Sequence, residues 1–179
     1  HNIARAKGVD IDDLVVVILD RPRHEQLIAD VRRTGARISL IPDGDVGGAI
    51  MTSIPESYVD VLMGIGGTPE GVLAACALRA SGGEIQGKLY ARSEEEYRTG
   101  RDAGYDFDKV LMMDDLIAAD DVFFAATGLT GGELLKGVAY FADGARTESL
   151  VMRGLTGTVR HIQATHSLKK LDLVSSIQY

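Results

Sequence analysis

The 179-residue sequence has a single cysteine, four prolines and no tryptophan. One cysteine cannot form a disulfide within the chain, which is typical of proteins kept in a reducing compartment. Long apolar runs are missing too: LVVVIL (14–19) is among the longest and is far shorter than the roughly 20 residues that span a bilayer. No signal-peptide pattern opens the chain. These absences predict a cytoplasmic protein with no membrane partner.

Positive charge is in short supply. The chain has 19 Lys and Arg against 26 Asp and Glu, a formal net charge of −7. Such a chain has no general attraction for nucleic acid, so a nucleic-acid partner is not expected and any phosphate must be bound by a local cluster.

A length of 179 residues suits one domain with a sizeable hydrophobic core better than two domains. We therefore expect one domain over residues 1–179.

Histidine is scarce as well, with four residues in the chain. His161 and His166 are five apart and have no cysteine or carboxylate beside them, so a zinc site is not expected there. His24 follows two arginines and is expected to begin a helix.

Apolar runs alternate with helical patterns over the first 83 residues. Three runs read as strands: DLVVVILD (13–20), RISLIP (37–42) and VDVLMGIG (59–66). The first is continuous and β-branched, which is typical of a strand buried on both faces. Helical segments follow at 21–35 and 68–83. This alternation predicts parallel strands joined by right-handed crossovers.

The second half of the chain has a different pattern. EIQGKLYAR (84–92) reads as a strand, SEEEYRTGRDAG (93–104) as a polar helix with a serine cap, and DVFFAATG (121–128) as a strand before a glycine turn. From 138 to 167 apolar and polar residues alternate around Asp143-Gly144, which predicts antiparallel strands. The expected fold class is α/β, with a mostly parallel sheet, helical crossovers and an antiparallel C-terminal part.

Two arginines follow the first predicted strand, where ligands bind in an open parallel sheet. The guanidinium groups of Arg21 and Arg23 suit phosphate oxygens, and Pro22 stiffens the segment between them. The same arginines could instead pair with Asp20 or Asp43 at a strand end. The sequence leaves both interpretations open.

Two carboxylates follow the second predicted strand. Asp43 and Asp45 flank Gly44, a spacing that brings both carboxylates near one ligand across a tight turn. They would hold sugar hydroxyls or a hard cation. The commoner use of Asp-Gly-Asp is to cap the turn itself, and this alternative also stays open.

A glycine-dense turn, MGIGGTPEGV (63–72), follows the third predicted strand. Gly64, Gly66 and Gly67 would let backbone N–H groups approach an anion, and the helix that follows adds its positive end. Glu70 suits that helix start on structural grounds alone. Beside a bound phosphate, however, the carboxylate would be repelled unless a cation lay between them, so Glu70 is also a candidate metal ligand.

Four motifs in this order closely resemble the class II fructose-1,6-bisphosphatases. They are LDRPRH (19–24), IPDGDVGGAI (41–50), GIGGTPEGVLAACAL (64–78) and ATGLTGG (126–132). The likeness continues through ESLVMRGLTGTVRHIQATHSL (148–168) and covers essentially the whole chain. The resemblance implies a sugar-phosphatase-like layered sandwich. It also implies Mg²⁺- or Mn²⁺-dependent hydrolysis of fructose 1,6-bisphosphate to fructose 6-phosphate in gluconeogenesis.

The resemblance also assigns residues. It implies that one set contacts substrate: Arg21, Pro22, Arg23, Asp43, Gly44, Asp45 and Gly67. It makes Glu70 a metal ligand and assigns no catalytic residue in this chain. The family's chain is nearly twice as long, and its N-terminal half supplies the remaining metal ligands and a water-activating threonine. We therefore expect a C-terminal portion of a two-domain sugar phosphatase, with the N-terminal half as partner and a dimer or tetramer as the assembly.

Two other functions are open at this stage. The first is a dual bisphosphatase that also accepts sedoheptulose 1,7-bisphosphate. The second is a half-module that binds sugar phosphate without catalysis. A dinucleotide-binding module is disfavoured, because the glycine turn lacks the pattern G-x-G-x-x-G.

Overall fold

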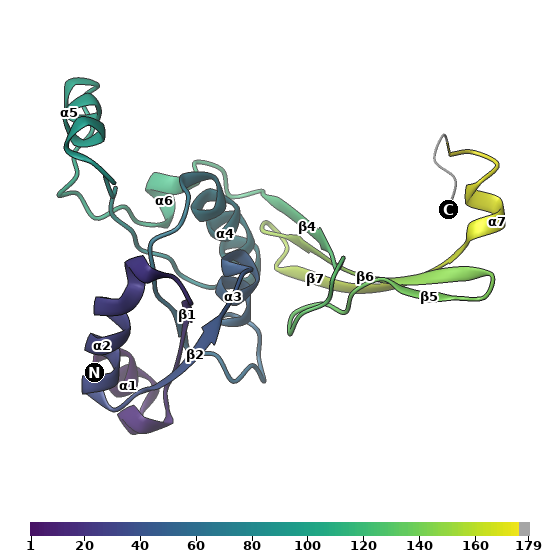
Figure 1. Ribbon diagram of the computed structural model, residues 1–179, viewed down its shortest axis with the longest axis horizontal. Helices are drawn as coiled ribbons and strands as arrows, with labels where there is room; N and C mark the ends of the chain where they lie inside the picture. The colour runs from purple at the N-terminus through teal and green to yellow at the C-terminus, as the bar shows by residue number, and fades with distance from the viewer. Residues whose placement is uncertain (176–179) are drawn as a thin grey trace.

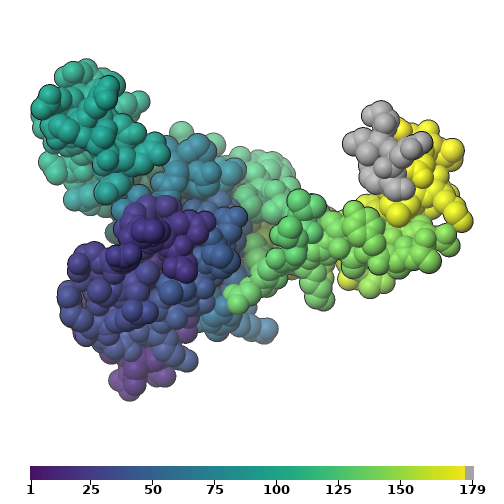
Figure 2. Space-filling model, in the orientation of Figure 1, coloured from purple at the N-terminus to yellow at the C-terminus, as the bar shows by residue number. Residues whose placement is uncertain are grey.

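The structure, a computed structural model, describes residues 1–175, so the last four residues of the predicted 1–179 domain lie outside the described residues. Figure 1 shows a body built from a small sheet and several helices. A second sheet extends from this body as a long arm, and a short helix projects on the opposite side. Figure 2 shows the same arm projecting well clear of the body.

A three-stranded parallel sheet forms the centre of the body. Its strands are β1 (Val15–Leu19), β2 (Arg37–Ile41) and β3 (Val61–Leu62), in the order β2-β1-β3. Both neighbours run parallel to β1, with Val16 opposite Ile38 on one side and Val61 on the other. The predicted parallel sheet is therefore confirmed, with β1 as its central strand.

Helices and short 3₁₀ turns precede, connect and follow these strands. They are α1 (Asn2–Lys7), η1 (Ile11–Asp13), η2 (Pro22–His24), α2 (Glu25–Thr34), α3 (Asp45–Met51) and α4 (Thr68–Ser81). Helix α2 buries Ile28 and Val31 against Val16 and Ile18 of β1. It ends at Gly35, whose φ of 92° is the left-handed conformation that glycine adopts without a steric cost.

Asp60 ties the start of β1 to the segment before β3. Its carboxylate accepts a hydrogen bond of 2.7 Å from the Val15 backbone N–H and another from the Lys7 ammonium group. Burial by itself would raise the pKa of this carboxyl, but the bonds from Lys7 and Val15 outweigh burial and hold the pKa below its ordinary value. Asp60 therefore stabilises the fold as a carboxylate.

We expect Asp60→Asn to lower the free energy of unfolding by about 1.5 kcal/mol at pH 7, because two charge-assisted hydrogen bonds are weakened. A lowered pKa stabilises the fold above the unfolded-state value of about 3.9, and this contribution is lost as pH falls through the folded-state value. The difference in free energy of unfolding between the variant and the unchanged chain should therefore become smaller as the pH falls from 7 to 3.5. Urea unfolding at several pH values measures it, with the exposed Asp102→Asn as control. A difference that stays constant with pH would contradict the role of charge.

The segment between the two sheets differs in part from its prediction. Helix α5 (Glu94–Asp102) is present, and the hydroxyl of Ser93 caps it by accepting a 3.1 Å hydrogen bond from the Glu96 backbone N–H. The strand predicted over 84–92 is wrong. That segment forms only an isolated bridge between Gly87 and Leu111, because no neighbouring strand in the described chain lies beside it. A short helix, α6 (Met113–Leu116), leads on to the arm.

The arm is a four-stranded antiparallel sheet. Its strands are β4 (Phe123–Thr127), β5 (Ala139–Phe141), β6 (Gly144–Arg153) and β7 (Thr158–Ser167), followed by α7 (Leu168–Leu171). Strand β6 is central: β4 and β5 pair with one side, and β7 pairs with the whole length of the other. The predicted antiparallel part is confirmed. The antiparallel part is larger than predicted. A mostly parallel sheet was expected, but among the described residues the antiparallel sheet has more strands than the parallel one.

Helix α4 lies between the two sheets. Its Ala77 and Ala80 pack with Leu150 and Met152 of β6, while its Ala74 and Leu78 belong to a second cluster with α3 and α6. Buried residues on several sides of one helix are expected where it separates two layers. No helix among the described residues is both long and apolar enough to cross a bilayer.

Candidate functional site

Three loops leave the parallel sheet at the same edge. Because β1, β2 and β3 are parallel neighbours, the segments 20–24, 42–45 and 63–67 all begin at their carboxyl ends. The first loop is tied to the end of β2, where the second loop begins, because the Asp20 backbone N–H donates a 2.8 Å hydrogen bond to the carbonyl oxygen of Ile41. All the residues predicted to bind substrate or metal lie on these loops or in the first turn of the helices that follow.

The first and third loops are joined through both polar groups of one residue, Ile65. Its backbone N–H donates a 2.8 Å hydrogen bond to Nε2 of His24, and its carbonyl accepts a 2.8 Å bond from Nε of Arg23. The other ring nitrogen of His24, Nδ1, lies 2.8 Å from the carbonyl oxygen of Leu19. Since a carbonyl can only accept, Nδ1 carries the proton and Nε2 is the acceptor.

His24 is completely buried and is the only polar or charged residue so buried in the described chain. As predicted, it stands at the start of α2. Its bridging role was missed, because its partner Ile65 is 41 residues away and nothing in the local sequence connects them. A Cβ at Gly64 would lie only 3.1 Å from Cε1 of His24, so the glycine turn must come this close for the bridge to form.

The arginines do not form the ion pairs that their alternative interpretation required. Arg21 donates a 2.9 Å hydrogen bond to the backbone carbonyl of Asp20, and Arg23 bonds to Ile65. Among residues 1–175 no ion pair joins either arginine to Asp20 or Asp43. Both guanidinium groups therefore keep their charge uncompensated by a carboxylate at the edge of the sheet.

Each aspartate bonds to the backbone N–H of the residue that follows it, and neither side chain caps α3, whose N-cap is Gly44. Asp43 accepts a 2.8 Å bond from the Gly44 N–H, and Asp45 accepts a 3.0 Å bond from the Val46 N–H. In each case a single carboxylate oxygen, Oδ1, is used. The second oxygen of Asp45 is close to the glycine turn, since a Cβ at Gly66 would lie 3.0 Å from it. These local bonds leave the second carboxylate oxygen of Asp45 beside the third loop.

Glu70 lies in the first turn of α4, and its side chain folds back over Gly67. A Cβ at Gly67 would overlap Oε2 of Glu70, so only glycine at 67 permits this position of the carboxylate. The backbone of Gly67 has φ −73° and ψ 149°, a conformation open to any residue. Glycine is therefore needed at position 67 because the Glu70 carboxylate lies so close to it, and not because the backbone is strained.

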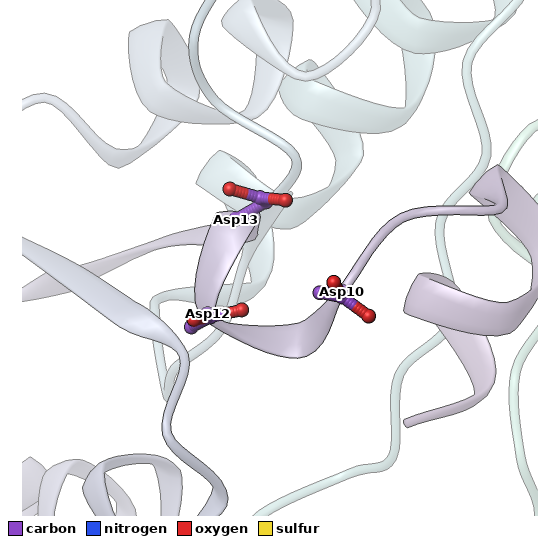
Figure 3. A group of neighbouring side chains, drawn as sticks. All are labelled: Asp10, Asp12 and Asp13. Carbon is purple, nitrogen blue, oxygen red and sulfur yellow. The ribbon is translucent and has the colours of Figure 1, made fainter.

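A separate group of carboxylates lies at the other edge of the same sheet. Asp10, Asp12 and Asp13 are exposed, and their nearest oxygens lie within 4.8 Å of one another. Figure 3 shows them on the turn and short helix that lead into β1. Sequence reasoning did not single them out, and they are not part of the three-loop site. Among the described residues this is the only group of three or more side chains of these kinds placed close enough to share a metal ion. Glu70 therefore does not have two further Asp, Glu, His or Cys ligands beside it in the described chain.

Comparison with known proteins finds phosphatases. Residues 1–166 match the family described as bacterial fructose-1,6-bisphosphatase, glpX-encoded. Fructose-1,6-bisphosphatase 1 class 2 of Escherichia coli strain K12 is 42% identical over 185 residues, which cover 96% of this chain and 55% of that protein. The class 2 fructose-1,6-bisphosphatases of Escherichia coli O6:H1 and of Shigella flexneri match with the same figures.

The chain belongs to the family of bacterial, glpX-encoded fructose-1,6-bisphosphatases, the family that its motifs predicted. It spans about half the length of the curated relatives it matches.

Proposed function

We propose that this chain forms the substrate-binding part of a metal-dependent fructose-1,6-bisphosphatase, which hydrolyses the 1-phosphate to give fructose 6-phosphate and phosphate in gluconeogenesis. One observation carries the proposal. In a chain of this family, the loops that hold two arginines and two aspartates, and the loop that leads into the first turn of α4 with Glu70, leave the same edge of one parallel sheet.

The arginines are assigned to phosphate. Arg21 and Arg23 are held through backbone oxygens and not by carboxylates, so their positive charge is available to an anion. Guanidinium groups would bind phosphate oxygens and offset the negative charge that grows there as the phosphoryl group transfers. Pro22 would limit the freedom of the segment between them.

We assign the two aspartates to the hydroxyl groups of the sugar. The glycine turn is assigned to close contact with the substrate. Asp43 and Asp45 would accept hydrogen bonds from sugar hydroxyls through the oxygens that their turns do not use. Gly44 makes the turn between them possible, because its φ of 85° strongly favours glycine. Gly67 would lie against the substrate beside Glu70.

Glu70 is assigned to a divalent cation. A carboxylate oxygen in the first turn of a helix suits Mg²⁺ or Mn²⁺, and the donor is of the hard type that these ions prefer. When bound, the cation would act as a Lewis acid and activate the attacking water. Glu70 would hold and orient one edge of that centre.

The remaining ligands are assigned to the N-terminal half that class 2 relatives carry outside the match. Glu70 lacks a group of companions in the described chain, and the match covers only 55% of each relative. With that half, the two sheets described here would become layers of a sugar-phosphatase-like sandwich. We also propose that the complete protein works in the cytoplasm as a dimer or tetramer.

Gly67→Ala should weaken metal binding without weakening the fold. The new methyl group would displace the Glu70 carboxylate, whereas the backbone accepts alanine. In a protein that also carries the N-terminal half, we expect about a tenfold rise in the Mn²⁺ concentration needed for half-maximal activity, the scale seen when a metal site is disturbed. Gly71→Ala is the control, since a Cβ there meets nothing within 4 Å. Equal Mn²⁺ requirements in both variants would contradict the link between Gly67 and Glu70.

Phosphate release from fructose 1,6-bisphosphate tests the function. The chain alone would be compared with a joined protein, in which the segment of the Escherichia coli K12 relative that precedes the matched region is fused ahead of His1. We expect activity in the joined protein only, and only with added Mg²⁺ or Mn²⁺. A folded joined protein that binds the sugar bisphosphate with these ions but releases no phosphate would overturn the proposal in favour of a binding module.

A further inference from the structure

The outer edge of β7 has no partner in the structure. Strand β7 is ten residues long and pairs with β6 along its whole length, and no other strand of residues 1–175 lies against its far side. Its residues 159–163 are all exposed. A long, exposed edge strand offers a row of free backbone donors and acceptors, which proteins normally cover, shorten or interrupt. In Figure 1, β7 begins near the body and runs along the arm beside β6.

One face of the same sheet is open as well. Side chains of paired residues lie on the same face, so the pairing of Phe124 with Met152 places both toward α4. Their neighbours in sequence face the other way. On that open face Phe123 is 67% exposed and Ile162 is 43% exposed, and Tyr140 joins them from β5. The arm therefore presents Phe123, Tyr140 and Ile162 on the face turned away from α4.

We propose that β7 and this open face bind the segment that class 2 relatives carry outside the match, and that this segment adds a strand to the edge of β7. The inference rests on the proposed function in one respect, namely that the complete protein contains such a segment. Strand addition would satisfy the backbone groups of the edge, and the rest of the segment would cover the exposed Phe123, Tyr140 and Ile162.

Two observations favour this occupant over a second copy of the chain. The match leaves a little under half of each relative unaccounted for, enough chain to cover both the edge and the face. In addition, β7 carries one formally charged side chain, Arg160, and no carboxylate. Self-pairing would bring two such strands together, whereas a neutral or acidic strand avoids that repulsion.

Hydrogen exchange followed by mass spectrometry tests the proposal. In the chain alone at low concentration, the amides of β7 that point away from β6 should exchange at the rate of an open edge. In the joined protein, peptides covering 158–167 should exchange at least about tenfold more slowly. Protection of the whole strand in the dilute chain alone would overturn the proposal, and so would equal exchange in the two proteins.

Ile162→Lys provides a second measurement on the joined protein. A charge at this position would disturb the covered face, so exchange over 158–167 should rise about tenfold. Val110→Lys is the matched control, because Val110 is similarly exposed at 46% but lies outside the arm. Identical exchange in both variants would overturn the proposal. Protection that appears in the chain alone only as its concentration rises, and that is unchanged in the joined protein, would assign the edge to a second copy.

These results are independent of catalysis. A joined protein that protects β7 but releases no phosphate would retain the interface and remove the proposed activity. A joined protein that hydrolyses fructose 1,6-bisphosphate while the amides of β7 exchange freely would retain the proposed activity and remove the interface.

Discussion

Glu70→Gln in the joined protein is expected to lower the rate of phosphate release about 100-fold at limiting Mg²⁺ or Mn²⁺. The amide has the shape of the carboxylate but no negative charge, so it is a far weaker ligand for a hard cation. Glu70 is exposed and bears on the fold only through the dipole of α4, which is worth about 0.5 kcal/mol at such a position. Stability should therefore change little while activity falls.

A metal titration separates this role from a structural one. If Glu70 binds the cation, raising Mn²⁺ should restore part of the lost rate in Glu70→Gln. The matched control is Glu95→Gln, because Glu95 is also an exposed glutamate in the first turn of a helix, α5, far from the three loops. Full activity of Glu70→Gln at limiting metal would rule out the assignment of Glu70 as a ligand.

His24→Ala should lower the free energy of unfolding of the chain by about 4 kcal/mol. Removing the ring leaves the Leu19 carbonyl and the Ile65 N–H without their partner, at about 1–3 kcal/mol each, and adds the cost of a cavity. Urea unfolding followed by circular dichroism measures the change. His24 is fully buried, so water cannot readily replace the imidazole.

Two further variants identify the cause of that loss. His24→Phe keeps most of the volume but neither hydrogen bond, so it should recover only the part of the loss that comes from the cavity. Arg23→Ala removes the other partner of Ile65, but this one is exposed, and the fold should lose less than about 1 kcal/mol. A loss in His24→Ala no larger than in Arg23→Ala would show that the buried bridge contributes little to stability.

The parts of the fold that could be predicted from sequence are those set by local pattern. The β-branched run at 15–19 is the buried central strand, Ser93 caps α5, and the alternation after Val138 gives the antiparallel hairpin. The strand predicted over 84–92 is wrong because an alternating pattern forms a strand only where another strand is available to pair with it. Here only Gly87 finds a partner.

The candidate site was predictable only at the level of loops. Parallel neighbours place all three loops at one edge, which the strand and helix pattern already implied. The contacts between the loops depend on distant residues: His24 with Ile65, and the second oxygen of Asp45 with Gly66. No local signal encodes such pairs. The substrate and metal roles of the site residues stay predictions.

Helix α4 joins the site to the arm as a single rod. Glu70 lies in its first turn and Ala80 packs against β6 near its other end, ten residues or about 15 Å further along. The methyl groups of Ala77 and Ala80 pack directly against Leu150 and Met152 of β6, so no long side chain of α4 separates the helix from the sheet at this point. The helix that carries Glu70 is therefore also part of the core of the arm, so the three-loop site and the arm share one structural element.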